Sequence, residues 1–276
     1  MMKAEEPLAT QHAELLLLGA RIRLNQSQPD FAGADQFLDR VLTATPPELG
    51  PEVDAETVSR YTVTAEQQAM ARQLRIVSFA GTGRVTEAGA ILSKAISQGP
   101  DQLLVLLDGL SAATAGQSVA LQTSLGQLQL DAVRRSRIDV TRLPAEQRVP
   151  FLLRIAEASE LAGKLPQAAD TYARLIRERP NDLAVRRNLA RLRSTLPGQA
   201  NQQRAKEHWK KIEAKYKAGS NDWMEARVEI IRCHVQLGED ELAKKLLTVT
   251  QLLYRKSGTA ETRQRLAAVA KQLKQK

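Results

Sequence analysis

The chain has 276 residues, enough for one or two domains with a buried core. Apolar residues make up 43% of the chain, which excludes a mainly disordered protein. Aromatic residues make up 4%, a low content for an enzyme pocket or a base-stacking surface. Cys233 is the only cysteine, which excludes an internal disulfide and a cysteine-rich zinc site, and the three histidines leave little for a metal centre.

The net charge of +9 is unevenly distributed along the sequence. Residues 1–140 contain 12 Lys and Arg and 16 Asp and Glu, a net of −4. Residues 141–276 contain 28 basic and 15 acidic residues, a net of +13. This asymmetry indicates an acidic protein partner, a nucleic acid or an anionic surface for the second half.

No segment of the sequence has the pattern of a membrane span or a signal peptide. The most apolar stretches, 15–20 and 103–115, are too short to cross a bilayer. The first ten residues carry acids and no apolar run, although the doubled Met suggests a piece of a longer chain that could carry a signal. The compartment and the oligomeric state stay open.

Apolar residues recur at helical spacing along almost the whole chain, and no long run alternates with a period of two. Segments that break helices separate these stretches, for example 25–30, 45–51, 81–83, 99–100, 197–198 and Gly258. The pattern predicts an all-α fold of about 12–13 helices, joined by short turns into antiparallel pairs.

A spacing of 5, 4, 3 and 5 residues recurs between the predicted helices. It runs through Gly163, Ala168, Tyr172, Leu175 and Pro180. The same positions are Gly83, Ala88, Leu92, Ala95 and Pro100 in an earlier pair, and Gly238, Ala243, Leu247 and Thr250 in a later one. We expect the glycine to close the first helix in a left-handed conformation. The alanine lets the second helix approach closely, and the next two positions fill the space between the helices.

On these positions the unit 149–182 resembles a tetratricopeptide repeat (TPR), and the second half is similar to C-terminal repeats of long bacterial TPR proteins. The resemblance implies a right-handed TPR-like α-solenoid. It implies a helix pair at 1–46, a linker at 47–63, a TPR-like unit plus a degenerate repeat at 64–142, and a basic TPR array at 143–276. In the degenerate part, 101–137, we expect leucine at an alanine position to push the helices apart.

The resemblance also implies a non-catalytic scaffold or adaptor that binds a protein partner in a groove and needs no cofactor or metal. The family pattern places these groove positions at Leu153, Glu157, Glu160, Arg187, Asn188 and Arg191. A second hypothesis is that the protein binds an anionic polymer or an acidic protein surface. It is favoured by a basic face formed by Arg186, Arg193, Lys206, Lys210 and Lys211. A third reading is a structural subunit of a larger complex, which predicts an exposed apolar patch.

The remaining residues give little support for a catalytic function. Cys233 and His234 are neighbours on a predicted helix and point about 100° apart, so the histidine cannot act as base for the thiol. We expect a buried Cys233 and a partly exposed His234. The pair Glu157 and Glu160 has no accompanying nucleophile, and we therefore predict that the protein is not an enzyme.

Overall fold

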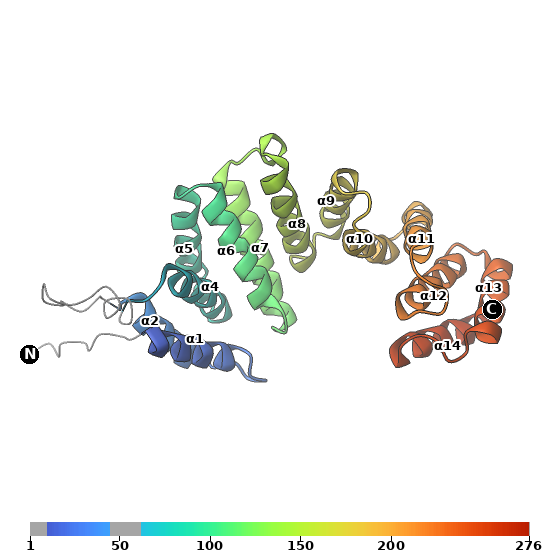
Figure 1. The fold of residues 1–276 in the computed structure, drawn as a ribbon, viewed down its shortest axis with the longest axis horizontal. Helices are drawn as coiled ribbons and strands as arrows, with labels where there is room; N and C mark the ends of the chain where they lie inside the picture. Colours follow the sequence, from blue (N-terminus) through green and yellow to red (C-terminus); the bar gives the residue numbers. More distant parts are fainter. Residues whose placement is uncertain (1–9, 45–61, 276) are drawn as a thin grey trace, which may run out of the picture. The chain divides into compact units, whose positions relative to one another are not determined.

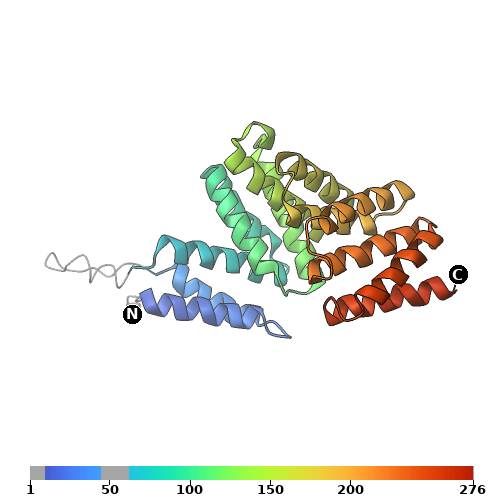
Figure 2. The same cartoon turned by 45° about the vertical axis from the view of Figure 1, so that its right-hand side comes forward.

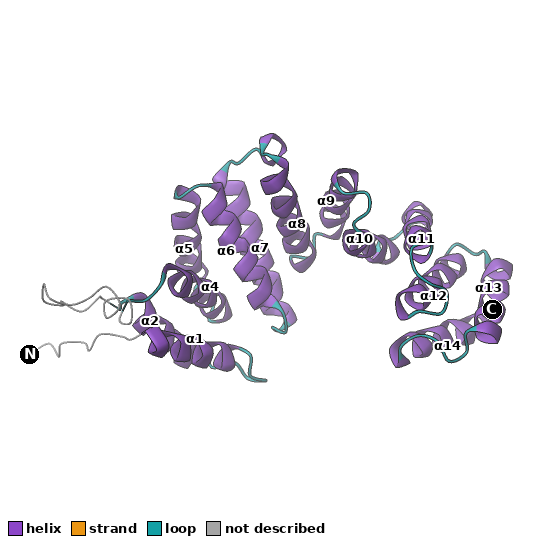
Figure 3. Cartoon of the chain, in the orientation of Figure 1, coloured by secondary structure: helices purple, strands orange, loops and turns teal. Residues whose placement is uncertain are grey.

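The structure is a computed structural model that describes residues 10–44 and 62–275. These residues form thirteen α-helices and one 3-10 turn and contain no strand, which confirms the all-α prediction and the predicted number of helices (Figure 3). The helices in chain order are α1 (Thr10–Leu24), α2 (Phe31–Leu42), α4 (Ala65–Gly81), α5 (Val85–Ser97), α6 (Pro100–Thr114), α7 (Val119–Ser136), α8 (Ala145–Leu161), α9 (Leu165–Glu178), α10 (Leu183–Thr195), α11 (Gln199–Glu213), α12 (Asn221–Gln236), α13 (Asp240–Leu253) and α14 (Ala260–Gln275) (Figure 1). The predicted linker 47–63 lies outside the described residues except for its last two positions.

The chain divides into two compact units, residues 1–164 and residues 165–276, called unit 1 and unit 2 here. Unit 1 contains α1 to α8, and unit 2 contains α9 to α14. The domain boundaries expected from the sequence remain predictions.

The recurrent glycine ends a helix in three places, as the sequence predicts. Gly83, Gly163 and Gly238 have φ angles of 76°, 72° and 75°. The residue after each glycine donates its N–H to a carbonyl five residues earlier, for example Lys164 to Ser159 at 2.8 Å. This hydrogen bond defines a Schellman motif. The turn requires a left-handed backbone conformation at the glycine, which residues with a side chain rarely adopt.

The three positions that follow each glycine in the repeated spacing are buried. Ala88, Ala168 and Ala243 are completely buried. Tyr172 and Leu175 follow in the best-matching unit, and each is 1% exposed. The alanine and the two positions that follow it are therefore buried, as the repeated spacing predicts.

In unit 1 the helix pairs are α1–α2, α4–α5 and α6–α7, and their first helices, α1, α4 and α6, pack on one another. Helix α1 packs on α2 and α4, α4 packs on α6, and α6 packs on α8. Figures 1 and 2 both show α1, α2 and α4 side by side at the N-terminal end of this unit. A capping box fixes the start of α4, because Thr64 and Gln67 exchange backbone and side-chain hydrogen bonds of 3.0 and 3.1 Å.

Helix α7, in the predicted degenerate repeat, packs more extensively on α8 than on α6. Leu121, Leu125 and Leu128 of this helix are buried. Helix α7 approaches α8 closely at Gly126, where an added Cβ would lie 2.7 Å from the carbonyl oxygen of Ala158. The sequence analysis did not identify this glycine, because it lies in mid-helix and outside the repeated spacing.

Unit 2 is a chain of helices in which neighbours in sequence pack on one another from α9 to α13, and α14 packs on α12 and α13. One buried cluster joins α10, α11 and α12 around Trp209, which is 2% exposed. A second cluster joins α12, α13 and α14 around Trp223. Trp209 thus occupies a core position, as the repeat spacing predicts.

Candidate interaction surfaces

Unit 1 has a cavity of about 510 Å³ between α1, α4 and α6, all first helices of their pairs. This volume lies within the range of small-ligand and peptide side-chain pockets. The lining combines apolar residues with three amides and one cation and includes no carboxylate. It consists of Arg21, Leu24, Asn25, Met70, Gln73, Leu74, Val77, Gly109, Ala112, Ala113, Ala115 and Gln117.

Two amide contacts hold the walls of this cavity. The side chain of Gln117 donates to the side-chain oxygen of Asn25 at 3.0 Å, and Gln73 donates to the backbone carbonyl of Val105 at 3.3 Å. A Cβ on Gly109 would lie 1.9 Å from Gln73, so the glycine leaves room for that side chain. The Gln73 bond therefore joins α4 to α6 beside the cavity.

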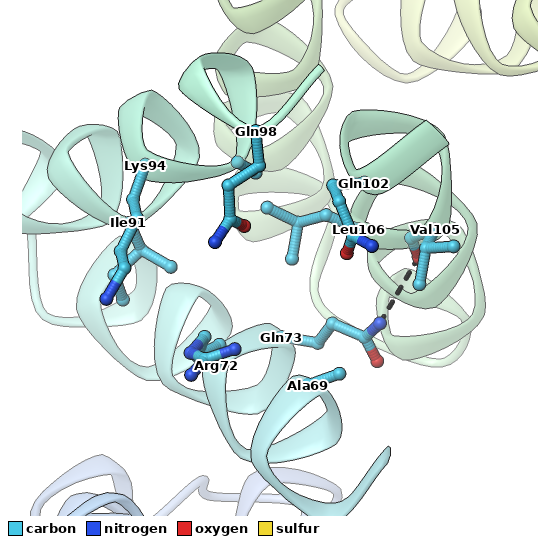
Figure 4. A pocket seen from close by; sticks show the side chains of 10 residues that line it. Ala69, Arg72, Gln73, Ile91, Lys94, Gln98, Gln102, Val105 and Leu106 are labelled. Carbon is cyan, nitrogen blue, oxygen red and sulfur yellow. Dashed lines mark hydrogen bonds between the residues drawn. The ribbon is translucent and has the colours of Figure 1, made fainter. Parts of the chain in front are cut away.

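A second hollow lies on the other side of Gln73, between α4, α5 and α6 (Figure 4). Arg72, Lys94, Gln98 and Gln102 surround it, and Ile91 and Leu106 supply apolar surface. Lys94 forms no ion pair within the described part of the chain, and no carboxylate lines the hollow. This face of unit 1 therefore offers apolar contact and hydrogen-bond donors without fixed negative charge.

The groove positions predicted on α8 lie in unit 1 and engage α6. Glu157 is half-buried and accepts hydrogen bonds from Ser111 at 2.8 Å and from Arg154 at 2.6 Å. Arg154 also pairs with Asp108 at 2.9 Å. Leu153 and Glu160 are half-buried. Glu157 is thus part of a polar cluster that joins two first helices.

The groove positions predicted on α10 lie in unit 2. Arg187 pairs with Asp222 at 2.6 Å and with Glu225 at 3.5 Å, both on α12. Asn188 is half-buried and Arg191 is exposed. The six predicted groove residues are therefore divided between two units.

The predicted basic residues differ widely in exposure. Arg186 and Lys206 are buried, at 7% and 5% exposure, and Arg193 is half-buried. Arg186 donates to the carbonyl of Pro180, Arg193 pairs with Asp170 at 3.1 Å, and Lys206 pairs with Glu239 at 2.7 Å. Lys210 and Lys211 are exposed.

Cys233 is completely buried in unit 2, as expected, and burial raises the pKa of its thiol to about 11. His234 is 5% exposed, so the expectation of a partly exposed histidine is wrong. It is buried because its ring contacts Glu239 in the turn between α12 and α13, which also receives Lys206. Burial lowers the pKa of His234. Cys233 and His234 therefore contribute to the packing of unit 2.

Two further findings concern the described residues alone. No group of three or more His, Cys, Asp and Glu side chains in 10–44 and 62–275 is placed to hold a metal ion. None of the helices described has both the length and the apolar character needed to span a membrane.

The paired helices, glycine turns and buried alanines define a helical-repeat protein, an α-solenoid. Residues 151–182 match the family model described as "Tetratricopeptide repeat". This match confirms, for residues 151–182, the resemblance predicted from the sequence. Repeats of this kind generally mediate protein–protein interactions.

Comparison with solved structures finds similarity to a tetratricopeptide repeat protein from Parabacteroides merdae ATCC 43184, whose crystal structure is at 2.39 Å resolution. The two chains are 13% identical with a TM-score of 0.32, and the match covers 94% of this chain and 99% of that chain. A search of curated proteins finds no match.

Proposed function

We propose that the protein is a non-catalytic scaffold or adaptor that binds a protein partner on the first helices of unit 1. The observation that carries this proposal is the cavity between α1, α4 and α6, with its apolar lining and amide groups. Met70, which lines it, is 40% exposed, and so is available for contact. An apolar side chain of a partner would remove this surface from water while backbone groups of the partner bond to the amides.

The predicted positions on α8 extend this proposed surface beyond α6. Leu153 would add apolar contact, while Glu157 would hold α8 against Ser111 of α6. The predicted positions on α10, Arg187, Asn188 and Arg191, are proposed as a separate contact surface in unit 2.

The experiment is a capture of partners from native extract with the full chain as bait and quantitative mass spectrometry as readout. The variant Met70→Glu with Ala112→Glu places two carboxylates in the cavity, where a desolvated charge is costly. The matched control is Val119→Glu with Ala120→Glu, which changes the same residue classes at exposed positions on α7. We expect the partner to be lost from the first variant and kept by the second. Equal capture by both variants would show that the cavity is not the binding surface.

A second candidate function, a structural subunit of a larger complex, is favoured by exposed apolar side chains on two helices. Leu15, Leu18 and Ile22 of α1 are 53–64% exposed. On α13 the exposed apolar residues are Leu242, Val249, Leu252 and Leu253. Sedimentation velocity over a wide concentration range tests this function. Self-association that Leu15→Lys and Leu252→Lys abolish would support it, whereas a monomer at all concentrations would contradict self-assembly.

A further inference from the structure

The solvent-exposed face of helix α11 in unit 2, called its outer side here, carries cations that have no carboxylate partner. Arg204 and Lys211 lie seven residues apart on the helix, and Lys215 follows just after its end. All three are exposed, and none forms an ion pair within the described part of the chain. We call these three residues the basic stripe.

The cations of the basic stripe have no ion-pair partner because most carboxylates of unit 2 pair with other cations. Glu213, on the same helix, pairs with Arg227 of α12 at 2.5 Å. Glu239 pairs with Lys206, and Glu229 pairs with Arg232 and Arg265. On the outer side of α11 only Glu207 offers a carboxylate. Arg204, Lys211 and Lys215 therefore keep their charges without a carboxylate partner on this side of α11.

His208 lies between Arg204 and Lys211 on α11 and is half-buried beside positively charged groups. Its Nδ1 lies 3.4 Å from a guanidinium nitrogen of Arg186 on α10. Burial, and then the charges of Arg186 and Lys211, lower the pKa of His208 to about 4. The imidazole is therefore neutral at pH 7, mainly because it is buried and further because Arg186, Lys211 and Arg193 are positively charged.

The available surface suits a polypeptide better than a nucleic acid. None of the aromatic side chains of unit 2 in residues 165–275 is exposed, so no platform for base stacking exists there. Trp209 is 2% exposed, and Tyr216 is partly buried against both core clusters.

We propose that the basic stripe on α11 is a docking surface for an acidic polypeptide segment of a partner protein. Charge complementarity is the driving interaction, because the three cations gain carboxylate partners without losing any existing ion pair. Helix α11 is 15 residues long, about 22 Å at 1.5 Å per residue, so an extended segment of about seven residues covers it. This surface is on a different unit from the cavity between α1, α4 and α6, and its test is independent of that function.

The test measures binding of a fluorescein-labelled glutamate-rich peptide of about twelve residues to the full chain by fluorescence anisotropy. The stripe variant is Arg204→Glu with Lys211→Glu and Lys215→Glu. The matched control is Lys245→Glu with Lys271→Glu and Lys274→Glu, which changes the net charge equally at exposed positions on α13 and α14. We expect the stripe variant to bind about tenfold more weakly or worse, the control to change by less than about threefold, and affinity to fall with added salt.

A second readout distinguishes docking at the stripe from general attraction to a basic protein. NMR titration of the His208 ring with and without the peptide should show its pKa rising in the complex, because bound carboxylates offset the field of Lys211 and Arg186. An unshifted His208, equal losses in both triple variants, or no binding of the peptide overturns the proposal. Tighter binding of an oligothymidylate or of anionic lipid vesicles than of the peptide also overturns it and identifies a different ligand class. Circular dichroism melting of each variant confirms that the binding changes do not reflect unfolding.

Discussion

The first helices of the two units present different surfaces although both units are built from the same helix pairs. In unit 1 the face of α1, α4 and α6 encloses a cavity lined by apolar and amide side chains. In unit 2, the corresponding helices α10, α12 and α14 are linked by ion pairs, from Arg187 to Asp222 and from Glu229 to Arg265. One backbone arrangement thus supports an open apolar face or a face whose charges neutralise one another. The fold alone does not determine which surface binds a partner.

The largest effect should come from Gly126, where unit 1 depends on direct contact between α7 and α8. In Gly126→Leu the added Cβ would meet backbone atoms of Ala158 and Ala162 at 2.7 and 2.8 Å. Backbone cannot move aside as a flexible side chain can, so we expect a loss of about 3 kcal/mol in the free energy of unfolding of unit 1, measured by denaturant titration.

The matched control for Gly126 is Gly89 on α5, where the nearest atom to an added Cβ is a guanidinium nitrogen of Arg135 at 3.7 Å. Gly89→Ala should stabilise unit 1 by about 0.5–1 kcal/mol, because alanine has the higher helix propensity. If both substitutions changed stability in the same direction, close packing would not explain the role of Gly126.

The next effect concerns the ion pairs that join the helices of unit 2. The Glu229 side chain is 5% exposed and binds Arg232 and Arg265 at 3.0 Å each. Glu229→Ala leaves two guanidinium groups without their shared partner and should cost about 2 kcal/mol. Glu241→Ala is the control: the Glu241 side chain is 87% exposed in its pair with Lys244, and its loss should cost less than about 0.5 kcal/mol. Chemical denaturation of both variants gives the comparison.

A smaller effect should appear in the pH dependence of unit 2 through His208. The folded-state pKa is lowered to about 4 from an ordinary 6.5, so between these values the unfolded chain binds a proton that the folded chain does not. This histidine therefore makes unit 2 less stable as the pH falls from 6.5 to 4, by about 1 kcal/mol after allowance for its partial exposure. The measurement is the difference in unfolding free energy between wild type and His208→Gln across this range, because Glu213 and Glu229, with raised pKa values, act in the opposite direction.

The smallest effect should follow from Arg187→Gln. Its pairs with Asp222 and Glu225 are partly exposed, so the unfolding free energy should fall by less than about 1 kcal/mol and the difference should shrink in 1 M NaCl. A loss as large as that for Glu229→Ala would mean that exposure does not separate the two ion-pair clusters.

Spacing along the sequence predicted the parts of the fold that repeat. The glycine turns at Gly83, Gly163 and Gly238 and the buried alanines that follow them are local consequences of residue type at fixed intervals. Gly126 could not be found in this way, since a mid-helix glycine is informative only when the facing helix is known. His234 was misjudged for a related reason, because its burial depends on Glu239 in the next turn.

The candidate surfaces were less predictable from the sequence than the fold. The family pattern indicates positions on α8 and α10. The cavity in unit 1, however, arises from residues that lie far apart in the sequence, such as Gln73 on α4 and Asn25 and Gln117 in the loops after α1 and α6. Similarly, a count of basic residues cannot separate Lys206, buried against Glu239, from Lys211, which is exposed. Tertiary pairing of each charge decides which cations can reach a partner.

The burial of Cys233 gives unit 2 a natural reporter of its own opening. The chain has a single thiol, and it lies in the cluster between α10, α11 and α12. A thiol reagent can reach it only while this cluster is transiently open, and the pKa of about 11 keeps the closed form unreactive at neutral pH. The rate of labelling therefore measures the opening equilibrium of one unit within the intact chain, with no engineered probe.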